Sequence, residues 1–164
     1  MHAPMNQADQ LPWERREIEL AYVADCGGDG GWVVYTVNGR TEYDYKYSKE
    51  LPHFYEHLND AGNEGWELIS IAGGPYVKLH YDYRHTLFQR PPVVTAIQWN
   101  YLVIDLTLRH THWWVDRVNA VDITTHIRWN ELLKQLQDER WQLIQAPFRT
   151  INQVGEAILK RQRV

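Results

Sequence analysis

The stretch Ala61–Ile71 reads Ala-Gly-Asn-Glu-Gly-Trp-Glu-Leu-Ile-Ser-Ile and separates a helical pattern from an apolar strand. Its two glycines predict a helix end, because glycine enters left-handed backbone conformations without a clash from a Cβ atom. A weaker copy follows at Trp141–Ile144, where Trp-Gln-Leu-Ile matches the Trp-Glu-Leu-Ile of Trp66–Ile69. The pattern therefore predicts one small unit written twice.

The first unit alternates apolar and polar residues on both sides of a helical pattern. Alternation predicts strands with one buried face, whereas the spacing of apolar residues from Leu51 to Leu58 predicts an amphipathic helix. Pro52 fits this helix because it falls in the first turn. The predicted strands are Glu17–Val23, Trp32–Val37, Thr41–Tyr47, Trp66–Ile71, Tyr76–Tyr83 and His85–Gln89, and the helix runs from Ser48 to Ala61.

The second unit repeats this order from Val93 onward. Trp99 and Ile104 fall at the same relative positions as Trp13 and Ile18. An extra hairpin before the helix is expected in the first unit only. The predicted strands are Trp99–Leu108, His112–Asp116, Val118–Ile123, Trp141–Ala146 and Glu156–Arg161, and the helix runs from Thr125 to Asp138.

Each unit is predicted to be a two-layer α+β arrangement, in which one helix covers one face of an antiparallel sheet. Matched apolar patterns imply matched cores, and duplicated units commonly keep the isologous contact of an ancestral homodimer. We therefore expect a pseudo-two-fold pair. The predicted domains are a disordered tail at 1–12, a first repeat at 13–91 and a second repeat at 92–164.

Two short segments, Gly65–Ile71 and Phe88–Pro91, follow a known family pattern. They resemble the glycine-tryptophan core and the closing Phe-Lys-Arg-like strand of the small bacterial domains grouped as DUF4177. The second repeat departs from the pattern, because Arg140 replaces the glycine before the tryptophan and Pro147 interrupts the strand. The resemblance implies a tandem duplication of this fold and carries over no catalytic residue. The function of the family is unknown.

The composition narrows the class of function. A formal charge of −4 disfavours nonspecific binding of DNA or RNA, which depends on Lys and Arg neutralising phosphates. Cys26 is the only cysteine, so no intrachain disulfide can form and a reducing, cytoplasmic setting is expected. No apolar run reaches the ~20 residues of a membrane span, and the N-terminus lacks a signal-peptide pattern. We expect a cytoplasmic protein without membrane contact.

Two pairs of histidines have spacings that occur in metal sites. His53 and His57 lie four residues apart on the predicted helix, and His110 and His112 would project to the same side of a strand. The first pair lacks the His-Glu-x-x-His order, and no third ligand follows at a diagnostic spacing. We interpret the first pair as part of a solvated helix face and the second pair, beside Trp113 and Trp114, as part of a packing surface or interface, with a metal site as the alternative for both.

The glycine-rich segment Cys26–Gly31 could expose backbone N–H groups to an anion. It matches neither a dinucleotide-binding fingerprint nor a Walker loop, and the chain contains no Gly-x-Ser-x-Gly elbow. We therefore interpret this segment as a flexible hairpin turn. The sequence predicts no cofactor and no catalytic residue.

Aromatic residues make up 13% of the chain. A single helix in each unit can cover only one sheet face, and this is too little to bury all of these aromatic side chains. Tyr and Trp are enriched in interfaces, so an aromatic contact surface is expected between the units or between chains. The predicted binding residues are Tyr43, Tyr45, Tyr47, Tyr81, Tyr83, Trp113, Trp114, Arg84 and Arg109.

The leading hypothesis is a non-enzymatic binding or assembly module with a protein partner or self-association. The alternative is a binder of a small ligand or single-stranded nucleic acid, held in an aromatic cleft between the repeats. Its edge would carry Arg84, Arg90, Arg109 or Arg128. A metal-dependent enzyme that uses the histidines is the third hypothesis, and no acid, base or nucleophile motif supports it.

Overall fold

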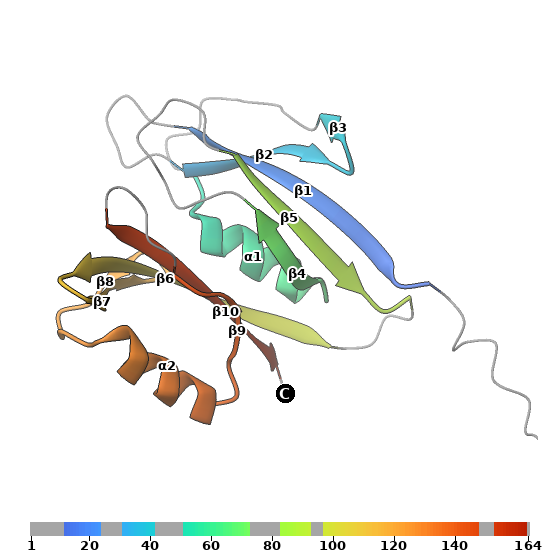
Figure 1. Ribbon diagram of the computed structural model, residues 1–164. Helices are drawn as coiled ribbons and strands as arrows, with labels where there is room; N and C mark the ends of the chain where they lie inside the picture. Colours follow the sequence, from blue (N-terminus) through green and yellow to red (C-terminus); the bar gives the residue numbers. More distant parts are fainter. Residues whose placement is uncertain are drawn as a thin grey trace, which may run out of the picture.

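The described part of the computed structural model contains two antiparallel sheets of five strands each and two α-helices (Figure 1). The first sheet has the strand order β3-β2-β1-β5-β4, and the second has the order β8-β7-β6-β10-β9. The predicted α+β class with two antiparallel sheet units is confirmed. The structure describes residues 12–23, 31–41, 51–72, 83–92, 97–147 and 153–163.

The strands of the first sheet follow the alternation of the sequence, with Leu20 and Phe88 on the buried face. The helix begins at Phe54, later than predicted, because the carboxylate of Glu56 accepts a hydrogen bond from the backbone N–H of His53 at 2.6 Å and caps the helix there. The elements are β1 (Glu14–Val23), β2 (Gly31–Val37), β3 (Arg40–Thr41), α1 (Phe54–Asn63), β4 (Glu67–Ala72) and β5 (Tyr83–Arg90).

The second sheet has longer central strands. Its helix also begins later than predicted, at Trp129, which stands at the same place in α2 as Phe54 in α1. The elements are β6 (Gln98–Arg109), β7 (His112–Val118), β8 (Val121–Asp122), α2 (Trp129–Asp138), β9 (Gln142–Gln145) and β10 (Val154–Arg163).

The hairpin of β2 and β3 and the hairpin of β7 and β8 have matching turns. Asn38 and Asn119 have φ angles of 49° and 50°, a left-handed conformation that asparagine adopts more readily than most residues. The side-chain oxygen of Asn38 accepts a hydrogen bond from Glu17 N–H at 2.8 Å, and that of Asn119 accepts one from Val103 N–H at 2.9 Å. A hairpin therefore precedes the helix in both halves, and the expectation that only the first would have one is wrong.

The two helices also end alike. Gly65 has a φ of 85°, and Arg140 has a φ of 68° at the matching position, so the arginine adopts the conformation that the glycine pattern requires. Trp66 and Trp141 follow, each with 7% of its surface exposed. The predicted equivalence of these two tryptophans agrees with their burial and with their place before an edge strand.

Helix α1 lies between the two sheets, and α2 lies on the far side of the second sheet (Figure 1). One core joins both halves of the chain, since Leu58 of α1 and Phe88 of β5 share a buried cluster with Tyr101, Val103 and Ile158 of the second sheet. A second core lies between the second sheet and α2. The second sheet is thus buried on both faces, whereas a sheet with one covering helix would bury one.

The contact between the halves runs in one direction. Helix α1 packs closely on β6, whereas no comparable contact joins α2 to β1 among the described residues. A two-fold axis would require both contacts, because an isologous interface repeats every contact in reverse. The predicted pseudo-two-fold pairing and the predicted covering of each sheet by its own helix alone are not confirmed.

Candidate functional site

Buried polar side chains gather where α1 and the first sheet meet the second sheet, a region that we call the seam. Among the described residues three polar or charged side chains are buried, and two of them, Arg84 and Glu156, lie here. Seven residues make the contacts of the seam that are described below: Asn59, Gly62, Glu67 and Arg84 of the first half, and Tyr101, Glu156 and Lys160 of the second half.

A buried ion pair joins β5 to β10. Arg84 donates two hydrogen bonds to the carboxylate of Glu156, each 2.8 Å long, and the two side chains are only 3% and 5% exposed. The guanidinium carbon lies 4.1 Å from the ring centroid of Phe54 and 4.6 Å from that of Trp32. Aromatic faces stabilise a cation that has been removed from water, so the pocket is built for an arginine and not for a lysine.

The charges continue along the second sheet. Glu156 and Asp105 are direct neighbours across β10 and β6. Burial raises the pKa of the Glu156 carboxyl, Arg84 lowers it, and the negative charge of Asp105 raises it further. Burial also raises the pKa of Asp105 against the opposing effect of Arg117, whose Nε lies 2.9 Å from its carboxylate. Two neighbouring carboxylates therefore depend on two arginines for their negative charge.

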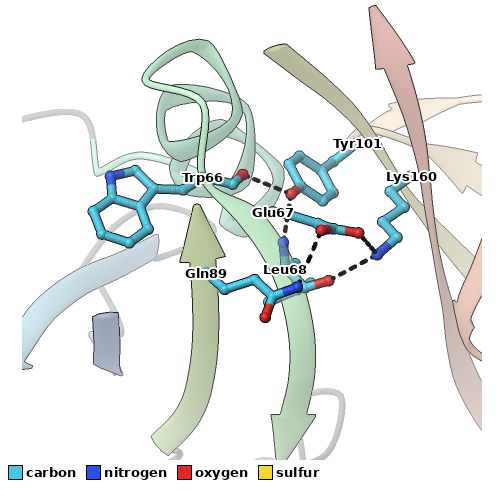
Figure 2. A network of polar contacts seen from close by, with 6 residues as sticks. All are labelled: Trp66, Glu67, Leu68, Gln89, Tyr101 and Lys160. Carbon is cyan, nitrogen blue, oxygen red and sulfur yellow. Dashed lines mark hydrogen bonds and ion pairs between the residues drawn. The ribbon is translucent and has the colours of Figure 1, made fainter. Parts of the chain in front are cut away.

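Tyr101 connects the second sheet to the backbone of the first half (Figure 2). Its hydroxyl donates a hydrogen bond to the carbonyl oxygen of Trp66 at 3.0 Å and accepts one from the N–H of Leu68 at 2.7 Å. Both backbone groups stand at the start of β4: Trp66 directly precedes the strand, and Leu68 is its second residue and pairs with Phe88 of β5. Burial raises the pKa of the Tyr101 hydroxyl, so the proton needed for this bridge is firmly held.

Lys160 makes a second link beside Tyr101 (Figure 2). Its Nζ contacts the carboxylate of Glu67 and donates a hydrogen bond to the carbonyl oxygen of Leu68 at 3.3 Å. Gln89 donates a hydrogen bond to the other carboxylate oxygen of Glu67 at 3.3 Å. The stem of Lys160 is mostly shielded from water, and its Nζ lies 5.2 Å from the ring centroid of Trp99. An ion pair of this kind is less weakened by salt than one on the surface.

Helix α1 approaches β6 closely enough to exclude a side chain. A Cβ atom built on Gly62 would lie 2.2 Å from the carbonyl oxygen of Trp99, which is far inside van der Waals contact. Three residues earlier, the side-chain oxygen of Asn59 accepts a hydrogen bond from Tyr101 N–H at 3.0 Å. The helix thus takes the place of a neighbouring strand along the part of β6 that precedes its pairing with β7, which begins at Ile104.

Chemically, the seam holds two sheets and a helix in a fixed register. Its ionisable groups face one another, and Arg84, Glu156 and Tyr101 are shielded from water. A substrate could reach none of these three without separation of the two halves. The arrangement favours a mechanical role for them.

The predicted tyrosine surface can be followed at one position. Tyr43, Tyr45, Tyr47 and Tyr81 lie outside the described residues. Tyr83, on β5, is 36% exposed, and its ring centroid lies 5.5 Å from that of Tyr35 in an edge-on arrangement.

The two predicted tryptophans of β7 have different surroundings. Trp113 packs against the core beneath α2, where a Cβ on Gly155 would approach its ring to 2.8 Å. Trp114 makes its ring contacts with Arg128, whose guanidinium carbon lies 5.5 Å from the ring centroid, and with His126, edge-on at 6.4 Å. We call Trp114, His126 and Arg128 the Trp114 cluster.

The predicted arginines are also separated. Arg84 is buried in the seam, whereas Arg109 is about half exposed and lies 3.4 Å from Asp116. Arg90 forms an ion pair with Glu14, and its guanidinium carbon lies 4.3 Å from the ring centroid of Trp66. The structure thus does not bring these three arginines to one cleft.

The histidine pairs do not converge. His53 precedes α1 and stacks on Tyr55 with an angle of 14° between the rings, whereas Nε2 of His57 bonds to the carbonyl oxygen of Trp32 at 2.7 Å. His110 lies in the turn before β7, with a φ of 56°, so it does not share a strand with His112 as predicted. Within the described ranges, no group of three or more His, Cys, Asp or Glu residues could hold a metal ion.

No family model, curated protein or solved structure matches this chain. The resemblance to DUF4177 domains therefore stays a prediction from the quoted motifs. Neither described helix is long and apolar enough to cross a membrane.

Sequence reasoning missed Tyr101, Glu156, Lys160 and Gly62 as the residues of the seam. A signal for Tyr101 was present, because Trp99, Tyr101 and Val103 make the second face of their strand apolar as well. A strand that is apolar on both faces is expected to be covered on both. No comparable signal distinguishes Glu156, since a single charge in an apolar strand is also common at an exposed edge.

Proposed function

We propose that the protein is a non-enzymatic assembly module, in which the seam fixes the two halves as one rigid body and the Trp114 cluster binds a protein partner. The observation that carries this proposal is the use of the buried charges. Arg84, Glu156 and Lys160 are all engaged in joining the halves. A site for general acid–base chemistry would instead need such groups within reach of a substrate.

The Trp114 cluster supports the binding part of the proposal. Trp and Arg are over-represented among the residues that dominate binding energy, and here the guanidinium of Arg128 lies over the ring of Trp114, with His126 edge-on to that ring. His126 and Arg128 are exposed, and Trp114 is half-buried. A half-buried ring with a fixed orientation loses little side-chain entropy on binding.

The alternative of a ligand in a cleft between the repeats is less well supported. That hypothesis placed Arg84 at the edge of the cleft, whereas the guanidinium is buried and paired with Glu156. The pseudo-two-fold arrangement of the units also gains no support, and we favour a head-to-tail arrangement in which the helix of one unit packs on the outer face of the next sheet.

Affinity purification of the tagged full chain from its native host tests the proposal. We expect a protein that is retained by the wild type and by Val121→Ser, since Val121 is 66% exposed on β8, and that is lost with Trp114→Ser. Equal retention by all three would show that the partner binds elsewhere. Recovery of nucleic acid or a small molecule in place of a protein would favour the alternative.

A further inference from the structure

The seam is a contact between two unlike surfaces. One is a helix surface, in which Asn59 bonds to a strand amide and Gly62 admits a strand carbonyl. The other is the outer face and open edge of a sheet, formed by Trp99 and Tyr101 of β6. Contacts between unlike surfaces of repeated units can continue indefinitely, and they then produce fibres.

Because both halves have the same fold, the chain carries a second copy of each surface. Both helices have ten residues, so Lys134 and Gln137 of α2 stand where α1 has Asn59 and Gly62. Trp13, directly before β1, matches Trp99 of β6, so Arg15, two residues later, stands where β6 has Tyr101. The ladders agree with this match, since Arg15 pairs with Gln89 on β5 and Tyr101 pairs with Lys160 on β10.

The second copy of each surface is exposed. Lys134 and Gln137 are exposed on α2, and Arg15 is exposed on β1. Trp13 is 51% exposed, whereas Trp99 at the matching position packs against the first core. The pairing of β1 with β2 begins only at Ile18, so no described strand lies beside the start of β1 on that side.

Neither exposed surface can make the contacts of the seam. At the position of Gln137, even a Cβ atom would meet the strand carbonyl at 2.2 Å in the geometry of the seam. Lys134 has no oxygen to accept the strand amide, and it would face the like charge of Arg15. Like charges brought together at an interface oppose association.

The buried ion pair is lost in the same way. Arg84 pairs with Leu20 in the first sheet, and Gly155 pairs with Leu106, the matching leucine, in the second sheet. The second half therefore has a glycine where the first half has Arg84. An arginine there is blocked, since Trp113 would lie 2.8 Å from its Cβ atom. On the other side of the contact, the exposed His85 replaces the buried Glu156.

We infer that Lys134 and Gln137 on α2, and Arg15 with its neighbour Glu17 on β1, are end caps that stop copies of this chain from stacking head to tail. The chain is thus limited to one step of a stack that its fold could otherwise extend. This inference concerns contacts between copies and does not depend on the partner proposed for the Trp114 cluster.

Two full-length variants test the caps. An open-helix variant carries Lys134→Asn and Gln137→Gly, and an open-sheet variant carries Arg15→Tyr and Glu17→Val, the residues present in the seam. Each variant keeps one capped end. We expect the wild type and each variant alone to sediment as monomers, and an equimolar mixture to show the mass of a one-to-one pair.

A reverse test uses the working contact. Gly62→Gln places a cap residue in the seam, and Asp60→Gln is its control at an exposed position of the same helix. We expect Gly62→Gln to lower the urea midpoint of unfolding clearly, and Asp60→Gln to leave it near that of the wild type.

Three results would overturn the inference. The wild type could form larger species that Lys134→Glu or Arg15→Glu dissolves, which would make these ends interfaces. A mixture of two folded open variants could remain monomeric. Gly62→Gln could unfold at the wild-type midpoint, and this last result decides the question even where an open variant fails to fold.

Discussion

Replacement of Tyr101 by phenylalanine removes one oxygen atom and tests the seam directly (Figure 2). The ring and its packing remain, so no cavity of side-chain size is created. The N–H of Leu68 and the carbonyl oxygen of Trp66 both lose their bond to the hydroxyl. A buried backbone group left without a partner costs about 1–3 kcal/mol. Two such groups predict a loss of about 2–6 kcal/mol in the free energy of unfolding.

Urea unfolding followed by tryptophan fluorescence measures this loss. Tyr83→Phe is the matched control, because that residue is exposed on β5 and the same atom is removed. A surface substitution of this kind stays within about 0.5 kcal/mol of the wild type. Hydrogen exchange should also become faster at the amide of Leu68. If Tyr101→Phe costs no more than Tyr83→Phe, water or a shift of β4 satisfies both groups and the hydroxyl does not hold the seam.

Three further outcomes follow from the same geometry. Above pH 10 the wild type should lose up to about 1.4 kcal/mol per pH unit relative to Tyr101→Phe, since the raised pKa keeps the hydroxyl protonated in the folded state while the unfolded chain ionises. Gly62→Ala should cost about 2–3 kcal/mol in urea unfolding, because its Cβ would overlap the carbonyl of Trp99. Arg84→Met should cost about 3–5 kcal/mol at pH 7 by leaving Glu156 unpaired. That cost should shrink as the pH falls through the raised pKa of Glu156, and the double variant with Glu156→Met should recover most of it.

The elements that could be predicted are those that depend on local periodicity. Ile18 and Leu20 share the inner face of their strand, and Phe54 and Leu58 share the inner face of their helix, as predicted. These predictions hold because the period of the sequence decides which residues share a face. The helix starts were misplaced, since capping by Glu56 depends on one hydrogen bond and not on a period. Element boundaries depend on such single contacts.

The arrangement of the halves could not be predicted from matched patterns. A repeat shows that two units have similar inner faces, but the relation between units depends on their outer faces. Here the outer faces differ: Tyr101 and Val103 are buried, whereas Arg15 and Glu17 are exposed at the matching positions. The expectation of a two-fold pair rested on the similarity of the repeats, and the contact rests on their difference.

The buried pair of Arg84 and Glu156 gives that difference a function within the fold. A seam made only of apolar residues would tolerate other registers of one sheet on another, because apolar contacts are not directional. Any other register would leave the guanidinium of Arg84 among Trp32 and Phe54 without its carboxylate, and a buried unpaired charge is strongly destabilising. Since the matching positions hold Gly155 and His85, no second pairing of the described sheet surfaces satisfies both charges. The ion pair therefore selects the register more than it adds stability, which is why its replacement by two methionines should cost little in unfolding free energy and more in the uniqueness of the native state.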